Sequence, residues 1–500
     1  MASERSHSDR RTLRWASLLV CILIALALEG SARPASGPRL SFSAAKYFAT
    51  GADPQSFVLA DVNGDGRPDV VTANSDGNSV SVLRNRGNGT FSSKRDYKVG
   101  TDPSPLLAAA DLNRDKRLDL VFRGSQPHSL SVMLNRGDGT FGQVQLADTG
   151  RGCCDQLKAV DLNGDRRADV VARTDGFAIV LLNRGDGSFL PAREYKVTRG
   201  FPAALVVADL SGDGKRDIST TSESDRVSVL LNKGDGSFGR EHTFKAPGRP
   251  LIADDLNRDG SPDLVTTDDP IDALGSVSVL INRGHGSFRP ARTYKPGRDV
   301  GQSEVADLNG DGAPELIVIS NVGVSVYKNS GAGRFRDKRN YPPHGWYNEF
   351  VVADVNGGGS PDLVFQSWDF GRVGVLLNRG NATFRRQLLE YYVAWGPIAL
   401  AAVDLNGDRS RDVLTLTDDL GGNRVSVLLN KPGKCDVQDV FRRTLDAARA
   451  RLTRGGCRLG RVTWGHSTVP PGHVMGQRPK FGAVLHGGST VDVILSGGRS

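Results

Sequence analysis

The sequence contains few of the residues and motifs that catalytic sites most often use. It has 5 cysteines and 8 histidines in 500 residues. Beyond the N-terminal segment the histidines are scattered without the spacing of a metal site or a catalytic triad, and neither GxSxG nor HExxH occurs. No matched pair of carboxylates stands outside the acidic loops described below. The sequence therefore gives little support to an enzymatic function.

Long hydrophobic runs are also scarce. The strongest one, residues 15–28, is too short to span a membrane comfortably. It follows Arg10 and Arg11, a pair that faintly resembles a twin-arginine signal, and small residues come after it. We interpret residues 1–32 as a secretory signal peptide and 33–39 as a short linker. We expect a bacterial protein that is secreted or held at the cell surface, with no transmembrane segment after cleavage.

An acidic nine-residue segment, in contrast, is abundant. It begins as DVNGDGRPD and recurs roughly every 50 residues, which is typical of a repeat architecture. Each copy carries oxygen-bearing side chains at most or all of positions 1, 3, 5 and 9. We call the copies loops one to eight; they begin at Asp61, Asp111, Asp161, Asp209, Asp255, Asp307, Asp354 and Asp404.

This spacing suits a hard cation, because calcium takes six to eight oxygen ligands and a tight loop turns alternate side chains inward. No His or Cys falls inside a loop, which disfavours transition metals, and magnesium usually retains several waters. We predict about seven or eight calcium ions. The predicted ligands are Asp61, Asn63, Asp65, Asp69, Asp111, Asn113, Asp115, Asp119, Asp161, Asn163, Asp165, Asp169, Asp209, Ser211, Asp213, Asp217, Asp255, Asn257, Asp259, Asp263, Asp307, Asn309, Asp311, Glu315, Asp404, Asn406, Asp408 and Asp412.

A single such segment would be read equally well as a surface turn, since Asp, Asn and Gly dominate turns for local reasons. Eight copies in register favour metal sites. Loops four and six depart slightly, with Ser211 at position 3 and Glu315 at position 9, and should still bind. Loop seven has Gly358 at position 5 and lacks that carboxylate. We expect loop seven to be weak or empty.

The segments around the loops predict strands. β-branched runs flank each loop, and a second motif, such as SVSVLRNRGNGTF from Ser79, reads as a strand, a Gly-rich hairpin and a further strand. Its GxGxF part resembles half of a nucleotide-binding fingerprint, but no helix follows it. Four strands per repeat predict an all-β, eight-bladed β-propeller, with seven blades as the alternative. The segment from Leu40 resembles a fourth strand and should complete the last blade.

Residues 40–433 resemble FG-GAP or VCBS repeats, as in the integrin α-subunit propeller and many secreted bacterial proteins. The resemblance rests on the DxNxDxxxD loops and the strands around them. It implies that the loops bind calcium on one rim of the propeller. Integrin propellers have seven blades, so the eighth copy is a departure. Relatives include adhesins, lectin-like modules and a few lyases, so the fold does not determine the function.

Residues 434–500 form a different module. A helix with Val440, Leu445, Ala448 and Leu452 on one face precedes short strands, and we expect Cys435 and Cys457 to pair. The adjacent Cys153 and Cys154 could form a vicinal disulfide, remain thiols or pair with another chain. The tail resembles a PASTA domain, which weakly implies cell-wall binding; Gln438 or Asp439 replaces the usual proline. The matching residues are Leu445, Ala448, Leu452, Gly460, Val474, Gln477, Pro479, Gly482, Val491, Val493 and Ser496.

Charge and aromatic residues suggest the partner. Of the 56 acidic residues, 23 stand at ligand positions of the loops. The remaining 33 acidic residues face 64 basic residues. An anionic glycan, peptidoglycan or a surface protein would fit such a surface, while sequence-specific nucleic-acid recognition would not. Aromatic segments from His344, Ser367 and Tyr391 are candidates for sugar stacking. We predict a calcium-binding adhesion or binding module for glycan, cell-wall or protein ligands; the alternative is a polysaccharide lyase-like or other carbohydrate-active propeller enzyme.

Overall fold

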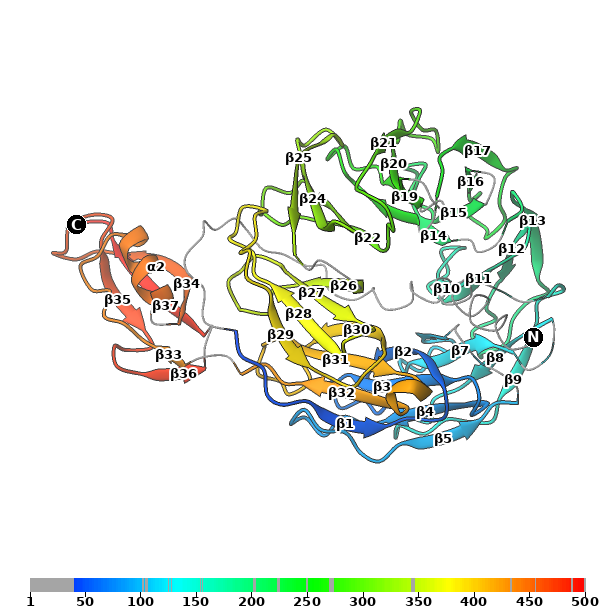
Figure 1. The fold of residues 1–500 in the computed structure, drawn as a ribbon, viewed down its shortest axis with the longest axis horizontal. Helices are drawn as coiled ribbons and strands as arrows, with labels where there is room; N and C mark the ends of the chain where they lie inside the picture. The colour runs from blue at the N-terminus through cyan, green and yellow to red at the C-terminus, as the bar shows by residue number, and fades with distance from the viewer. Residues whose placement is uncertain are drawn as a thin grey trace, which may run out of the picture.

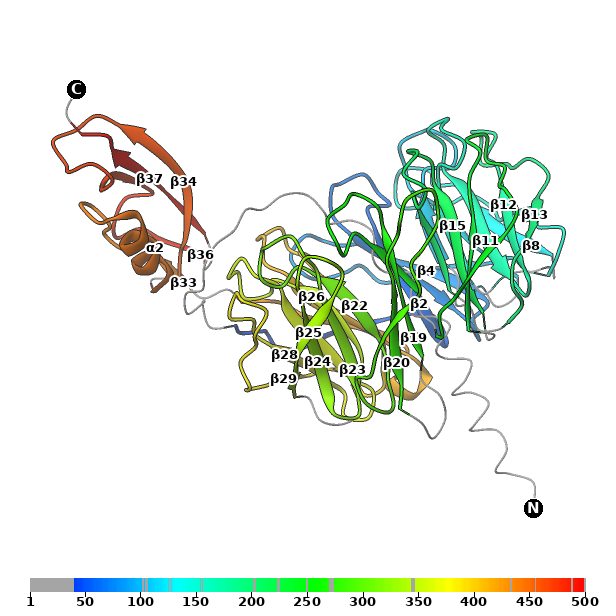
Figure 2. The ribbon, with the colours of Figure 1, turned by 90° about the horizontal axis from the view of Figure 1, so that it is seen from above.

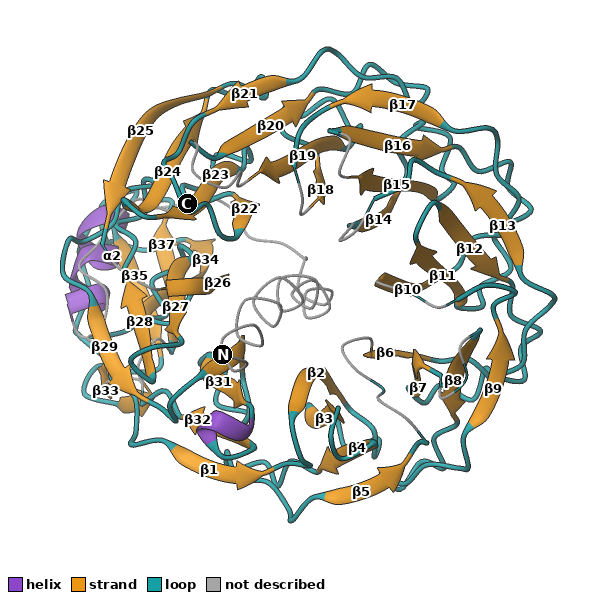
Figure 3. Ribbon diagram, turned by 45° about the vertical axis from the view of Figure 1, so that its right-hand side comes forward, coloured by secondary structure: helices purple, strands orange, loops and turns teal. Residues whose placement is uncertain are grey.

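The repeats fold into a ring of small antiparallel sheets, as Figures 1 and 3 show. The computed structural model describes residues 40–500, except 101–102, 104–106, 125, 127, 153, 155, 201–203, 223–224, 249–250, 269–273, 343–346, 432–433, 455, 487–488 and 499–500. Eight four-stranded sheets are present in this part of the chain. The predicted signal peptide and linker lie outside it. No helix among the described residues is long and apolar enough to cross a membrane.

The first four sheets are meanders of consecutive strands. They comprise β2 (Pro54–Ala60), β3 (Asp69–Asn74), β4 (Ser79–Leu83) and β5 (Arg95–Lys98); β6 (Leu107–Ala110), β7 (Asp119–Arg123), β8 (Ser129–Met133) and β9 (Gln145–Asp148); β10 (Gln156–Val160), β11 (Asp169–Thr174), β12 (Phe177–Leu181) and β13 (Arg193–Lys196); and β14 (Leu205–Ala208), β15 (Asp217–Ser222), β16 (Arg226–Leu230) and β17 (His242–Lys245).

The remaining four sheets repeat this order, and the eighth takes its outer strand from the N-terminal end. They comprise β18 (Leu251–Asp254), β19 (Asp263–Asp268), β20 (Ser276–Leu280) and β21 (Arg292–Tyr294); β22 (Ser303–Ala306), β23 (Glu315–Ser320), β24 (Gly323–Asn329) and β25 (Phe335–Tyr341); β26 (Tyr347–Ala353), β27 (Asp362–Ser367), β28 (Arg372–Leu376) and β29 (Leu389–Tyr392); and β30 (Pro397–Val403), β31 (Asp412–Thr417), β32 (Arg424–Leu428) and β1 (Lys46–Ala49). The 3-10 helix η2 (Asp419–Gly421) connects β31 to β32. Because β1 pairs with β32, the predicted exchange of the N-terminal strand is confirmed.

The second and third strands of each sheet are buried along nearly their whole length. All six residues of β3 and all five of β4 are buried, because each sheet packs both of its faces against neighbouring sheets. The hydrophobic clusters accordingly lie between adjacent sheets. One joins the first sheet to the last through Phe57, Val70, Leu414 and Leu416. Edge-to-face aromatic pairs such as Tyr97 with Phe141, 5.8 Å apart, add to these contacts at the outer strands.

The C-terminal module is a small α+β unit that projects beside the ring (Figure 2). It contains β33 (Lys434–Asp436), α2 (Leu445–Arg454), β34 (Arg458–Gly465), β35 (Val474–Arg478), β36 (Val484–His486) and β37 (Thr490–Ser496). The strand order is β34-β37-β35, with β34 parallel to β37. Val440 lies outside α2, contrary to the predicted helix face, because Thr444 caps the helix start. Its side chain is nevertheless buried in the same core as Ala448 and Leu452.

The cysteine pairings stay predictions. Cys457 and Cys154 are buried, with 3% and 4% exposed surface. The side chain of Cys435 and the whole of Cys153 lie outside the described part of the structure.

Candidate functional site

The acidic loops and the Gly-rich hairpins lie at the same end of the sheets. A loop joins the first strand to the second in every sheet, and a hairpin joins the third to the fourth in the first seven, so in an antiparallel meander both connections fall on one side. The hairpins are confirmed: Asn85 bridges to Phe91, and Gly87 and Gly89 adopt positive φ angles of 76° and 67°. Each repeat therefore places its two conspicuous motifs next to each other.

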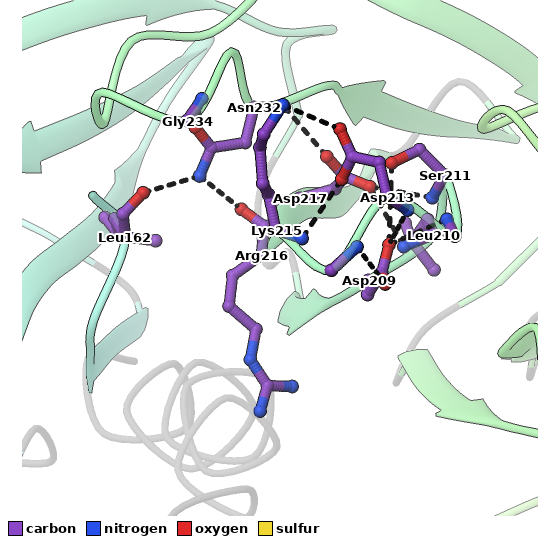
Figure 4. Close-up of polar contacts among 12 residues, drawn as sticks. Leu162, Asp209, Leu210, Ser211, Asp213, Lys215, Arg216, Asp217, Asn232 and Gly234 are labelled. Carbon is purple, nitrogen blue, oxygen red and sulfur yellow. Dashed lines mark hydrogen bonds and ion pairs between the residues drawn. The ribbon is translucent and has the colours of Figure 1, made fainter. Parts of the chain in front are cut away.

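Loop four shows how the side chains at positions 1 and 5 are held (Figure 4). Asp209 Oδ1 accepts hydrogen bonds from the amides of Gly212 and Asp213 at 2.7 and 3.1 Å, and its Oδ2 accepts one from Gly214 at 2.8 Å. The carboxylate of Asp213 accepts hydrogen bonds from the backbone amide and from the side-chain ammonium group of Lys215, both at 3.0 Å. The loop is thus coiled around its own carboxylates, as expected for Asx-type turns.

The position-9 carboxylate points into the sheet and links the two motifs (Figure 4). Asp217, the first residue of β15, is fully buried. Its Oδ2 accepts the amide of Leu210 at 2.9 Å, and its Oδ1 accepts the amide of Asn232 at 2.8 Å. The side-chain amide of Asn232 then donates to the carbonyl of Leu162, in loop three of the preceding sheet, at 2.7 Å. One carboxylate and one asparagine therefore connect a loop, its hairpin and the neighbouring sheet.

This asparagine contact is repeated around the whole ring. In each repeat the hairpin asparagine donates to the position-2 carbonyl of the preceding loop, over 2.5–2.9 Å, and the last contact joins the first sheet to the eighth. The pairs are Asn85–Leu405, Asn135–Val62, Asn183–Leu112, Asn232–Leu162, Asn282–Leu210, Asn329–Leu256, Asn378–Leu308 and Asn430–Val355. The sequence-based interpretation of these segments as plain turns missed this role. The available signal was an Asn two residues before a Gly, which recurs in seven of the eight repeats.

The position-9 carboxyls are electrostatically unbalanced in the protein alone. Burial, together with the carboxylates at positions 5 and 1, raises the pKa of Asp263 and Asp412 to about 7 and that of Asp69 and Asp169 to about 6. The two backbone amides that each one accepts act in the opposite direction. A cation in the loop would compensate both the burial and the repulsion, so the donor set fits a hard divalent ion.

Other observations also bear on this fit. A carboxylate oxygen has two lone pairs, so an amide contact leaves acceptor capacity. In loop two, Asp111 Oδ1 is buried and has no hydrogen-bond partner in the structure. Basic side chains at position 7 lie beside position 5, as with Arg167 and Asp165 at 3.6 Å, but such exposed pairs are weak. Among the described residues, no three His, Cys, Asp or Glu side chains are already grouped closely enough to hold a metal ion.

Besides loop four, loops six and seven depart from the common loop sequence. In loop six, Glu315 accepts the amide of Leu308 at 2.9 Å and the side-chain amide of Asn309 at 2.8 Å, so its longer arm still reaches the loop. In loop seven, Asp362 keeps the position-9 contacts, with Asn378 at 2.8 Å. Position 5 of loop seven, however, offers only a glycine.

Aromatic side chains gather at the opposite end of the seventh and eighth sheets. Trp368 follows β27 and lies 5.4 Å from Trp395, which precedes β30. Phe370, Tyr392 and Trp395 are 54%, 66% and 44% exposed. We call Trp368, Phe370, Tyr392 and Trp395 the aromatic patch. The predicted segments from Ser367 and Tyr391 thus come together. In the segment from His344, residues 344–346 lie outside the described residues, and Tyr347 and Phe350 are buried in a hydrophobic cluster, so they are not available for sugar stacking.

The ring of four-stranded sheets with repeated acidic loops defines a repeat β-propeller. A family model described as FG-GAP-like repeat matches residues 61–122, 111–172, 161–220, 255–318, 307–365 and 354–415, more than half of the chain. The chain therefore belongs to the FG-GAP-like repeat family. No match was found among curated proteins.

Several solved structures are similar to this chain at low sequence identity. Sqt1 from Chaetomium thermophilum is 14% identical, with a TM-score of 0.50 over 78% of this chain and 99% of that one. An Agrocybe aegerita lectin that recognises non-reducing terminal N-acetylglucosamine is 24% identical, with a TM-score of 0.43 over 61% and 80%. The V. cholerae biofilm matrix protein Bap1 is 12% identical, with a TM-score of 0.31 over 80% and 89%. Of these three matches, only the one to Sqt1 has a TM-score that supports an argument, and it supports the fold alone.

Proposed function

We propose that the chain is a secreted, calcium-binding module of a bacterial surface, with all eight sheets as blades of one closed propeller and a PASTA-like C-terminal domain. The acidic loops bind calcium and stabilise the rim, and the molecule binds glycan or cell-wall material without converting it. The observation that carries the calcium assignment is the buried position-9 carboxylate beside two further carboxylates in seven of the eight loops.

The aromatic patch supports glycan as the ligand class. The indole rings of Trp368 and Trp395 lie 5.4 Å apart at an interplanar angle of 40°. Phe370 and Tyr392, two and three residues from them in the sequence, are exposed. Large exposed aromatic rings are costly on a soluble surface unless a partner covers them, and their faces suit the apolar faces of sugars. An enzyme acting on polysaccharide is the second candidate, and it would need general acid and base groups near this patch.

Replacement of Trp395 by alanine is expected to weaken binding to purified peptidoglycan or surface polysaccharide by on the order of tenfold, because stacking contributes about 0.5–1.5 kcal/mol beyond burial. Co-sedimentation with the insoluble polymer measures retention. Leu190→Ala is the matched control, since Leu190 is 37% exposed and lies outside the patch. Equal retention of both variants would remove the patch as the binding surface, and release of soluble sugar products would favour the enzyme.

The raised pKa values of the position-9 carboxyls predict that a rise in pH changes their contribution to folding stability in opposite directions with and without calcium. In the metal-free protein the folded state holds protons on Asp263 and Asp412 up to about pH 7, whereas an unfolded Asp loses its proton near pH 4. Their contribution to folding stability therefore falls as pH rises between these values. Bound calcium requires the ionised carboxylates, so with calcium the contribution falls as pH is lowered.

Melting temperatures at pH 5 and pH 7.5, each in calcium and in chelator, measure this effect. Other titrating groups contribute equally to both series, so the comparison is the difference between the two pH dependences. We expect the gain in melting temperature from calcium to be much larger at pH 7.5. A gain independent of pH would show that the position-9 carboxyls do not take part in calcium binding.

A further inference from the structure

Loop seven, which lacks the position-5 carboxylate, is contacted by an arginine of the C-terminal module. Arg458 is the first residue of β34, and its amide is fixed to the tail by a bond to the carbonyl of Ser489 at 2.9 Å. Its Nη2 donates to Asp354 Oδ2 at 2.9 Å, and its Nε donates to the carbonyl of Gly357. The guanidinium thus contacts the position-1 carboxylate and the position-4 carbonyl of the loop, and the position-1 carboxylate is one that a metal loop offers to its cation.

The loop sequence suits this contact. A Cβ on Gly357 would lie 3.0 Å from Arg458 Nη2, so a side chain there would crowd the guanidinium. Without a carboxylate at position 358, the loop keeps Asp354 as a partner for a single positive charge. Arg258 offers a contrast, because it contacts only the position-5 carboxylate of Asp311, at 2.8 Å on an exposed surface. Arg458 and Asp354 are less exposed, at 38% and 24%.

We propose that loop seven is a docking site for the C-terminal module, in which the guanidinium of Arg458 takes the place that a cation has in the other loops. The contact joins residues 104 positions apart in the sequence. It fixes the module at the loop side of the ring, independently of calcium. A planar, always charged donor with several N–H groups is suited to this role, because it can bind a carboxylate and a carbonyl at once.

The first test removes the arginine. Small-angle X-ray scattering of the full chain is expected to give a larger radius of gyration for Arg458→Gln than for the wild type, because the module is released from the ring. The wild-type radius should be the same in calcium and in chelator, below the melting temperature. Arg461→Gln is the control, since Arg461 is an exposed residue on the same strand. An unchanged radius for Arg458→Gln would overturn the proposal.

The second test restores the missing ligand. Gly358 has no positive φ angle, and the nearest atom to an added Cβ is the side-chain oxygen of Asn356 at 2.6 Å, which can rotate away. Gly358→Asp is therefore expected to fold, to bind one more calcium ion than the wild type, and to release the module when calcium is added. If Gly358→Asp and the wild type bound the same number of calcium ions, the proposal that the Arg458 guanidinium takes the place of a cation in loop seven would be contradicted.

This arm rests on the proposed calcium binding of the other loops, whereas the Arg458→Gln arm does not. If no loop bound calcium in either protein, the proposed function would fail. A larger radius for Arg458→Gln would then still support the docking contact.

Discussion

Removal of calcium at neutral pH is expected to lower the melting temperature by roughly 10 °C or more. A ligand that binds only the folded chain contributes about 2.7 kcal/mol per site at a hundredfold excess over its dissociation constant, and seven complete loops add their contributions. In domains of this size each kcal/mol changes the melting temperature by about 2 °C or somewhat less. The effect is large because the position-9 carboxyls are buried next to other carboxylates.

Differential scanning calorimetry with and without chelator measures this effect, and magnesium serves as the control ion. Magnesium prefers an octahedral shell with several waters and should restore little of the loss. A melting temperature that does not respond to chelator, or to a tenfold series of calcium concentrations, would mean that the loops are structural turns.

Substitution of Asp263 by alanine is expected to destabilise the propeller even in chelator, by about 2–5 kcal/mol. The side chain is fully buried and accepts the amides of Asn282 at 2.7 Å and Leu256 at 3.1 Å. Its removal leaves two buried donors unsatisfied, each at a cost of about 1–3 kcal/mol. It also loosens Asn282, which reaches the carbonyl of Leu210 in the preceding sheet.

Asp259→Ala in the same loop is the matched comparison. Asp259 is exposed and accepts only a local amide, from Ser261 at 2.9 Å. It should cost little in chelator and lower stability only when calcium is present. Denaturant unfolding of both variants, in calcium and in chelator, separates the two roles. Equal losses in chelator would refute the structural role of position 9.

Local patterns were sufficient to predict much of the fold. The regular spacing of the acidic loops predicted one sheet per repeat, because β-branched runs that favour strands flank each loop. The orphan segment from Leu40 predicted the exchanged strand, because the eighth repeat lacks a fourth strand of its own and the segment supplies it. The expectation that loop seven binds calcium weakly or not at all rests on the missing carboxylate at Gly358 and stays a prediction.

Contacts between repeats could not be predicted in this way. An asparagine before GxG is a common turn residue, so nothing local shows that Asn232 reaches a carbonyl 70 residues earlier. The pairing of Arg458 with Asp354 joins two different modules and has no sequence period at all. The position-9 aspartates were assigned only as ligands, although their buried amide contacts make them structural residues as well.

The most direct test is the number of calcium ions bound per chain, measured by elemental analysis of the purified protein after exchange into calcium-containing buffer and removal of free ion. Seven ions are expected, one for each loop with oxygen-bearing side chains at all four positions. Prior dialysis against chelator should reduce this number to near zero. A value of zero or one in calcium would contradict the assignment of the loops as calcium sites.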